Sequence, residues 1–358
     1  MTTLSAARTR VSNWLFDHAL PLWAERGVDA QGRFFEQLDF DGRPVTGLRR
    51  RTRVQARQVY VFCEAAALGW AQGRAVAKAG LDQLIADRRR DDGLWVSATD
   101  DDGVVVDETP DLYDLAFVLF ALAAAHRVLN DARARPLVLE TLAAIDRLMA
   151  SSHGGWEEAL PPRLPRRQNP HMHMLEAMLA WQAIAPDPAF EAAARTSLDL
   201  CKQRFLIDGA IREYFAEDWS ADPATGHVIE PGHLEEWTWL LKQAGEDSEL
   251  ATALHRRAAA QGYRDGFAIR EIGPAGETLD GGRRLWAQTE AIRTGLSFGD
   301  AGVSGLIAAV FDTHLATAVP GLWVDSYDAE GRSHDAAAPA SSLYHLMTAF
   351  SELLRSDA

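Results

Sequence analysis

Cysteine, basic charge and long apolar runs are all scarce in this sequence. The two cysteines, Cys63 and Cys201, lie far apart in apolar stretches, which predicts two buried thiols in a reducing compartment. The 358 residues include 36 Lys and Arg against 51 Asp and Glu, a formal net charge of −15. Neither nucleic acid nor an anionic membrane is therefore expected as a partner. No stretch approaches the ~20 apolar residues of a membrane span, and no basic N-terminal segment precedes an apolar one, so we expect a soluble, cytoplasmic protein.

Linkers and cofactor motifs are absent as well. The chain has no Ser/Gly tract, Pro-rich spacer or block of like charge that would divide it, so we expect residues 1–358 to form a single domain. It contains no nucleotide-binding glycine pattern, no P-loop and no Gly-x-Ser-x-Gly motif. We therefore expect no cofactor.

What the sequence does contain is internal repetition, at a period of roughly 55–60 residues. Six short segments rich in Gly, Asp and aromatic residues begin at Gly32, Gly93, Gly154, Asp208, Asp265 and Gly321. Each of them predicts a β-hairpin, because Gly adopts turn conformations at no steric cost. The stretches between them have a period of 3.6 and predict about twelve helices. These are expected at 3–25, 51–71, 73–90, 111–130, 133–151, 169–185, 188–205, 232–245, 248–263, 284–298, 301–317 and 340–355.

Helices that alternate in pairs around six repeats favour an all-α fold, an (α/α)6 toroid with short hairpins at the mouth of a pocket. The helices that directly follow a hairpin, such as 111–130 and 169–185, are apolar almost all round and should form the inner ring. Helix 73–90 is amphipathic and should face solvent. Functional residues are then expected at the N-termini of the inner helices.

Histidines occupy three of these N-termini. His173, His233 and His345 lie at the starts of the inner helices 169–185, 232–245 and 340–355. Glu176 and Glu236 follow the first two at i,i+3 spacing, which places each carboxylate on the same helix face as its histidine. A carboxylate in that position orients the imidazole and raises its basicity. The pattern favours acid/base chemistry.

Other roles for the histidines stay open at this stage. A single histidine at a helix start is often a cap or a packed polar residue. Three histidines and a glutamate can also hold zinc. However, no His-x-x-x-His or His-Glu-x-x-His spacing occurs, and the ligands would have to converge from three helices. We expect no bound metal.

The remaining inner helices begin with further polar and aromatic side chains. Arg53 and Arg57 share a helix face at i,i+4 spacing, Tyr113 opens the next inner helix, and Trp286 and Gln288 open the fifth. An arginine beside aromatic rings suits a hydroxyl-rich ligand or a developing enediolate oxygen. For Arg53, an ion pair with a carboxylate of a neighbouring helix is the structural alternative.

Two charged segments carry two interpretations each. Arg163, Arg166 and Arg167 precede the third inner helix and form either a solvated loop or an anion subsite. The acidic residues between 107 and 111 precede the second inner helix, where acids complement the helix dipole. A carboxylate pair there would alternatively serve glycoside hydrolysis.

Taken in order, these motifs resemble the N-acylglucosamine 2-epimerase superfamily over nearly the whole chain. The matching segments are residues 56–60, 113–117, 169–177, 232–237, 286–291 and 344–345. The resemblance implies an (α/α)6 barrel that needs no metal and moves a proton at C2 of an aldose. It implies that His233 and His345 are the acid/base pair, and that Arg57, His173 and Glu236 surround the sugar.

The end of the chain favours one branch of this superfamily. Residues 338–346 lack the Pro-Arg that follows the last histidine in the N-acylglucosamine epimerases. They also lack the Trp that precedes it in the cellobiose epimerases. This segment looks more like that of the mannose isomerases, to which the sulfoquinovose isomerases are related. We expect an aldose–ketose isomerase that converts D-mannose to D-fructose through a cis-enediol(ate). A monosaccharide 2-epimerase, a mannose-6-phosphate isomerase, a glycoside hydrolase or lyase, and a non-catalytic sugar-binding toroid are the alternatives. The expected partner is a small monosaccharide, and the protein is expected to be a monomer or homodimer.

Overall fold

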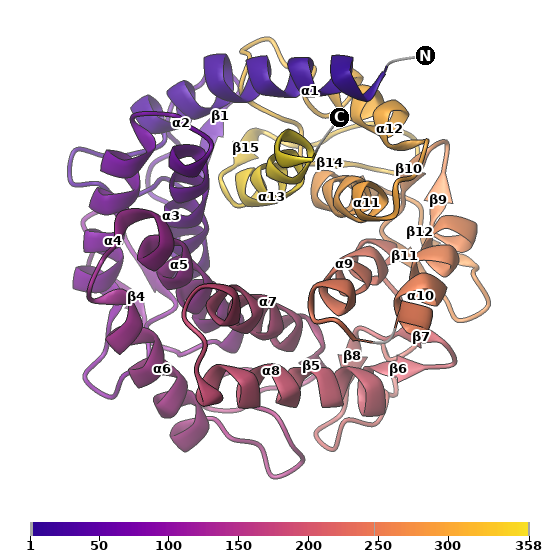
Figure 1. The fold of residues 1–358 in the computed structure, drawn as a ribbon, viewed down its shortest axis with the longest axis horizontal. Helices are drawn as coiled ribbons and strands as arrows, with labels where there is room; N and C mark the ends of the chain where they lie inside the picture. The colour runs from indigo at the N-terminus through magenta and orange to yellow at the C-terminus, as the bar shows by residue number, and fades with distance from the viewer. Residues whose placement is uncertain (1–2, 247, 357–358) are drawn as a thin grey trace. The chain divides into compact units, whose positions relative to one another are not determined.

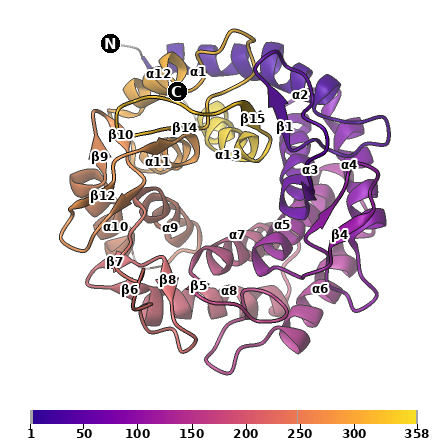
Figure 2. The same ribbon diagram turned by 180° about the vertical axis from the view of Figure 1, so that it is seen from behind.

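The computed structural model describes residues 3–246 and 248–356, drawn in Figures 1 and 2. Contacts between residues divide the chain into two compact units. The middle unit comprises Ala30–Phe34 and Thr46–Val228, and the terminal unit comprises the described residues within Met1–Asp29, Phe35–Val45 and Ile229–Ala358. Each unit is built from pairs of helices joined by short strands and turns.

The middle unit contains three helix pairs. They are α3 (Thr52–Ala67) with α4 (Gly73–Arg88), α5 (Leu112–Leu129) with α6 (Ala134–Leu148), and α7 (Asn169–Ile184) with α8 (Pro188–Leu200), which continues as the π-helix η2 (Cys201–Phe205). Helix α5 packs against both α3 and α7. These three helices are buried over most of their length, while α4 exposes its polar face. The predicted difference between inner and outer helices is therefore confirmed in this unit.

The terminal unit repeats the arrangement with three more pairs. Its inner helices are α9 (Pro231–Gln243), α11 (Leu285–Phe298) and α13 (Ser341–Arg355), and α11 packs against the other two. Helices α10 (Ser248–Gln261) and α12 (Val303–Asp312) pack on α9 and α11. The N-terminal segment α1 (Leu4–Asn13), η1 (Trp14–Ala19) and α2 (Leu20–Arg26) supplies the last outer helix, of which α1 contacts α12 and α13.

All twelve predicted helices are present among the described residues, with most ends within a few residues of their predicted positions. The largest difference is in α12, which was expected to reach residue 317 but ends at Asp312. Thr313 leaves the helical region with φ −121° and ψ −79°. Residues 313–315 form a turn instead.

Helix α5 has the length and composition of a membrane-spanning helix, which the sequence analysis did not anticipate. Among the described residues it is the one helix that meets both criteria, with 18 residues and a mean hydropathy of 1.6. It is 78% buried inside the structure, because α3, α6 and α7 surround it. Its apolar character therefore reflects its place in the core.

The six predicted hairpins are only partly correct. Local hairpins form around Asp102-Gly103 (β3, Ala98–Thr99, with β4, Val105–Asp107), Asp208-Gly209 (β6, Leu206–Ile207, with β7, Ala210–Ile211) and Asp265-Gly266 (β9, Tyr263–Arg264, with β10, Phe267–Ala268). A fourth joins β11 (Glu271–Ile272) to β12 (Thr278–Asp280). In the two-residue turns, Asp208 and Asp265 each have φ of 51° and are followed by Gly at 71° and 84°, as type I′ turns require.

At Gly32, Gly154 and Gly321 the structure has turns and single bridges instead of hairpins. Strands from different repeats pair there and elsewhere: β1 (Gln37–Asp39) with β15 (Ala337–Pro339), β2 (Arg50–Arg51) with β3, β5 (Arg166–Arg167) with β8 (Tyr214–Phe215), and β13 (Arg283–Arg284) with β14 (Ser326–Tyr327). The hairpin prediction failed at these positions because the strands pair with partners from other repeats, which no local pattern connects.

A glycine in α4 tests how tightly the outer helices pack. An ideal Cβ on Gly80 would lie 2.3 Å from a ring carbon of Phe34, which is itself buried. We expect Gly80→Ala to lower the free energy of unfolding by ~1–3 kcal/mol, the usual cost of overpacking. Gly305 in α12 is the matched control, since nothing lies within 4 Å of its ideal Cβ. Gly305→Ala should raise stability by up to ~1 kcal/mol. Urea denaturation measures both, and a Gly80→Ala variant as stable as the parent would contradict the packing described.

Candidate active site

In the middle unit, the starts of α3, α5 and α7 bring a cationic and aromatic cluster together. Arg57 Nη2 donates to the hydroxyl of Tyr113 at 2.7 Å, and the guanidinium lies 4.0 Å from the centre of the Phe117 ring. The His173 ring centre is 5.2 Å from that of Tyr113 and 4.5 Å from that of Phe117. The predicted i,i+3 pair is present, with His173 Nδ1 3.0 Å from Glu176 Oε2. A flat aromatic surface with fixed hydrogen-bonding groups suits a sugar.

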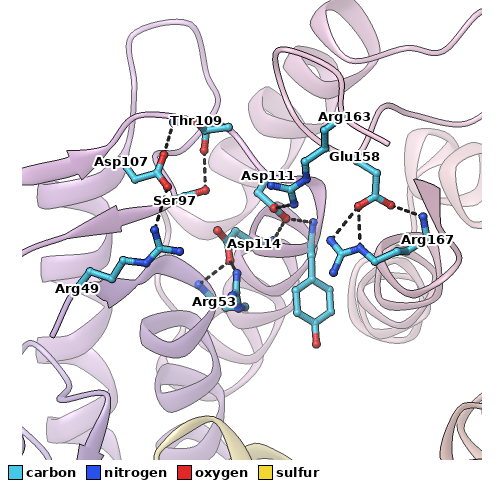
Figure 3. Close-up of polar contacts among 11 residues, drawn as sticks. Arg49, Arg53, Ser97, Asp107, Thr109, Asp111, Asp114, Glu158, Arg163 and Arg167 are labelled. Atoms are coloured by element: carbon cyan, nitrogen blue, oxygen red, sulfur yellow. Dashed lines mark hydrogen bonds and ion pairs between the residues drawn. The ribbon is translucent and has the colours of Figure 1, made fainter. Parts of the chain in front are cut away.

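Arg53 forms an ion pair with a carboxylate of a neighbouring helix, as the structural interpretation of this residue predicted. Its Nη1 lies 2.9 Å from Oδ1 of Asp114, a carboxylate that is only 1% exposed (Figure 3). Burial raises the pKa of Asp114 to about 6; the nearby charge of Asp111 adds to the shift, and Arg53 opposes it. Asp111 itself accepts hydrogen bonds from the backbone N–H groups of Tyr113 and Asp114. It therefore caps α5, which fits the helix-dipole interpretation of this acidic segment.

In the terminal unit, a buried carboxylate holds His345. Nδ1 of His345 on α13 lies 2.8 Å from Oε1 of Glu290 on α11, and Glu290 has no solvent exposure. On its other side, Glu290 Oε2 lies 3.5 Å from Nη1 of Arg293, one turn further along α11. The guanidinium of Arg293 is held in turn over the Trp239 ring at 3.4 Å. An ionised Glu290 accepts a hydrogen bond from Nδ1–H of His345, which leaves Nε2 of His345 as the basic nitrogen.

Glu290 was not predicted as a site residue, although it lies in segment 286–291, one of those that resemble the family. Glu290 and His345 are 55 residues apart, so no local spacing links them. The pairing depends on the contact between α11 and α13, which only the fold supplies.

His233 and His345 both pack against Trp286. The ring centre of Trp286 lies 4.7 Å from that of His233 and 5.8 Å from that of His345. Gly232 permits this close approach, since a Cβ there would lie 2.7 Å from the indole ring. The predicted acid/base residues and one predicted substrate-binding residue are thus brought together by α9, α11 and α13.

The carboxylates around His233 are arranged less simply than the spacing suggested. His233 Nδ1 lies 3.7 Å from Oε2 of Glu230, at the residue before α9. The pairing of His233 with Glu236 stays a prediction, and so does a role for Glu236 in binding substrate. Glu235, its neighbour, turns to the outer helix, where its carboxylate meets His255 Nδ1 at 2.7 Å.

Gln288, one of the predicted binding residues, bonds to the backbone, and its role in binding substrate stays a prediction. Its side chain has no solvent exposure. Its Oε1 accepts from the backbone N–H of Ala268 at 2.8 Å, and its Nε2 donates to the carbonyls of Ala268 and Arg284 at 2.8 and 3.0 Å. Both amide hydrogens of Gln288 therefore bond to backbone carbonyls, and the side chain connects β10 to α11. Gln55 fastens Phe34 to α3 through the same two kinds of bond.

His171 and Arg166 also have structural roles. His171 is buried, accepts the backbone N–H of Trp156 at 3.1 Å, and has its pKa lowered to about 3 by burial and by Arg166. Arg166 is 1% exposed and pairs with Glu157 at 2.7 Å. The three arginines before α7 therefore form neither one solvated loop nor one joint subsite.

Most tryptophans are core residues too, with eight of the eleven buried.

The described residues include side chains that could serve as metal ligands. His173 with Glu176, and His233 with Glu230, each bring an imidazole and a carboxylate within 4 Å of one another. Zinc takes ligands of both kinds. Metal-independent activity therefore stays a prediction.

The pKa of Asp114 provides a test of this electrostatic arrangement. An unfolded Asp loses its proton near pH ~4, whereas the folded state retains it to about pH 6. The contribution of Asp114 to stability therefore falls as pH rises from 4 to 7. We expect the stability of Asp114→Asn, measured by urea denaturation relative to the parent, to increase over this range.

Asp131 is the matched control for that experiment. Its hydrogen bond to Arg133 lowers its pKa, so Asp131→Asn should lose stability relative to the parent as pH rises. The same slope for both variants would contradict the assignment for Asp114.

Comparison with known proteins places this arrangement in a family. The model of the N-acylglucosamine 2-epimerase (GlcNAc 2-epimerase) family matches residues 33–349. A mannose-6-phosphate isomerase of Rhizobium meliloti (strain 1021) is 35% identical over 380 aligned positions, covering 96% of this chain and 95% of the relative. A D-mannose isomerase of Thermobifida fusca is 29% identical over 260 positions, covering 67% of this chain and 63% of the relative.

Solved structures match over nearly the whole chain as well. A cellobiose 2-epimerase from Spirochaeta thermophila DSM 6192 has a TM-score of 0.87 at 22% identity, covering 98% of this chain and 96% of the other. A D-mannose isomerase structure has a TM-score of 0.86 at 21% identity, covering 97% of each chain. With the paired helices, these likenesses confirm the predicted (α/α)6 fold. The chain therefore belongs to the N-acylglucosamine 2-epimerase family of sugar isomerases and epimerases.

Proposed function

We propose that this protein is an aldose–ketose isomerase that interconverts D-mannose and D-fructose, with His233 and His345 moving the proton between C2 and C1. The observation that carries the proposal is the terminal-unit cluster, in which Glu290 holds His345 and Trp286 contacts both histidines. Family membership and relatives named mannose isomerases support the same chemistry.

The reaction requires a base whose pKa lies near the working pH. Imidazole meets this requirement, and removal of the C2 proton next to the aldehyde gives a cis-enediol(ate). Delivery of a proton to C1 then yields the ketose. Glu290 orients His345 for one of these transfers and stabilises its protonated form. Trp286 offers the apolar face of the sugar a ring to pack against.

The polar groups of the middle unit are proposed to bind the sugar. Arg57 and Tyr113 supply donors for hydroxyls and for the developing enediolate oxygen. His173, oriented by Glu176, supplies a further donor or acceptor and can assist ring opening. Arg53 contributes by holding Asp114 at the start of α5, one residue from Tyr113.

A 2-epimerase is the second candidate, since the same enediol(ate) protonated at C2 from the opposite face yields the epimer. The cellobiose 2-epimerase structures share the fold with this chain, and the two outcomes differ only in which carbon receives the proton. A glycoside hydrolase of this fold would instead need a carboxylate pair beside its substrate. Asp111, from the acidic segment considered for that role, is engaged in capping α5.

Single replacements in the terminal unit test the proposal. With D-mannose in the presence of EDTA, we expect fructose from the parent protein and a loss of about 10²–10⁴-fold in kcat for His233→Ala and for His345→Ala. Glu290→Gln keeps an acceptor for Nδ1 but removes the charge, so kcat should fall by about 10–100-fold and the pH–rate profile should shift to lower pH.

Glu235→Gln is the matched control, because it also neutralises a buried carboxylate that pairs with a histidine in the same unit. We expect this variant to retain the parent kcat while its stability changes. If either histidine variant retained more than about a tenth of the parent activity, the assignment of His233 and His345 to proton transfer would be wrong. Activity lost with EDTA and restored by Zn²⁺ would instead support a metal.

A further inference from the structure

Three side chains of α11 form a stripe on one face of the helix. Trp286, Glu290 and Arg293 follow one another at i,i+4 and i,i+3 spacing, which aligns them along the helix. Trp286 contacts the rings of His233 and His345, and Glu290 meets Nδ1 of His345 at 2.8 Å. Arg293 lies 3.5 Å from the second carboxylate oxygen of Glu290. The stripe thus connects Arg293 to His345 through Glu290.

Arg293 is buried at a position where a charge is costly. Its side chain is 4% exposed, and the side chain of Glu290 is fully buried. The guanidinium lies 3.4 Å from the centre of the ring of Trp239, a half-buried residue of α9. A cation over a tryptophan ring and beside a carboxylate is stabilised by both groups. Apolar side chains of similar volume often replace a buried ion pair without loss of stability. Packing alone therefore does not explain the charge of Arg293.

The charge of Arg293 determines what remains when His345 loses a proton. If Glu290 stood alone, deprotonation of the imidazole would leave an uncompensated negative charge in the interior. Arg293 compensates that carboxylate, so the same step leaves a neutral pair of side chains. Burial away from water strengthens this effect, because charges interact more strongly at low dielectric. Arg293 therefore favours the neutral imidazole, whose Nε2 is able to accept a proton.

Charged groups from other elements act at the two ends of α13. Asp325, which precedes β14, accepts a hydrogen bond from Ser342 Oγ in the first turn and forms an ion pair with Arg284 at 3.1 Å. Arg8 of α1 donates to backbone carbonyls in the last turn of α13 and just beyond it. The stripe on α11, by contrast, lies beside the ring of His345 in the second turn.

We propose that Arg293, supported by the ring of Trp239, is a positioning residue for His345. It keeps the carboxylate of Glu290 ionised and directed at Nδ1, and it thereby sets the pH range in which His345 accepts and delivers protons. This inference rests on the proposed isomerase function, and it adds to that function a residue that acts through Glu290 instead of on the sugar.

Titration of His345 by NMR tests the proposal without depending on activity. Carbon-13-labelled histidine resolves the imidazoles, and the His345 signal is the one missing from the spectrum of His345→Gln. Arg293→Met removes the charge at similar volume. We expect the pKa of His345 to rise by about 1–2 pH units in this variant, because loss of the proton then leaves a net negative charge in the interior. A pKa equal to that of the parent would overturn the proposal.

Further substitutions separate charge from packing. Arg293→Gln keeps a hydrogen-bond donor for Glu290 without the charge, and it provides the same test if Arg293→Met does not fold. Arg293→Lys restores a cation and should return the pKa of His345 toward that of the parent. Glu290→Gln removes the opposite charge and should lower this pKa. Shifts in one direction for the neutral variants of both residues would overturn the proposal, as would a shift in Arg293→Lys as large as that in Arg293→Met.

Arg283→Met is the matched control. Arg283 lies in the same unit, and its guanidinium also rests on aromatic rings, 4.4 Å from the centre of Phe267 and 4.8 Å from that of Tyr327. These rings belong to β10 and β14 instead of the helices that carry the stripe and its partners. We expect Arg283→Met to lower stability in urea without changing the pKa of His345. A change as large as that in Arg293→Met would reflect a general effect of losing an arginine and would overturn the proposal.

The pH dependence of kcat/KM for D-mannose connects the titration to the reaction. In Arg293→Met, the limb of the profile that His345 controls should move to higher pH by the same amount, and Arg293→Lys should move it back. A profile that stays in place while the NMR titration shifts would overturn the role in proton transfer. If the parent protein does not convert mannose, the isomerase proposal fails, and the NMR titration alone then decides whether Arg293 controls His345.

Discussion

The contact between Glu290 and His345 couples the chemistry of the terminal unit to its packing. A buried carboxylate is costly unless charged or hydrogen-bonding groups compensate it, and Glu290 meets His345 at 2.8 Å and Arg293 at 3.5 Å. The contact with His345 requires α11 and α13 to keep one register, whereas Arg293 lies on α11 itself. The same register places Trp286, on α11, against the His345 ring. The proposed proton-transfer residues are therefore held by the interior of the unit.

In the middle unit, too, buried polar side chains are compensated by charged or hydrogen-bonding partners. Its inner helices are apolar along most of their length, and their polar side chains gather at their N-termini, where neighbouring helices compensate them. Arg53 pairs with Asp114, and Glu176 pairs with His173. The proposed binding groups at these positions therefore have structural partners of their own.

Much of this arrangement could be predicted from the sequence, because helical periodicity and composition are local properties. The twelve helices, the inner and outer faces, and the histidines at helix starts all followed from spacing. The partners of those histidines did not. Glu290 reaches His345 from another helix, and Gln288 turns to the backbone of Ala268. The strands that pair between repeats were missed for the same reason, since each pairing joins segments that no local pattern connects.

Proton NMR of D-mannose with the protein in D₂O, with EDTA present, tests the central claim most directly. The account predicts fructose that carries deuterium at C1, because an imidazole that exchanges its proton with solvent delivers it to that carbon. Glucose deuterated at C2 as the main product would contradict the isomerase assignment in favour of an epimerase. Fructose formed without any solvent deuterium would contradict an imidazole that exchanges its proton with solvent between removal at C2 and delivery to C1.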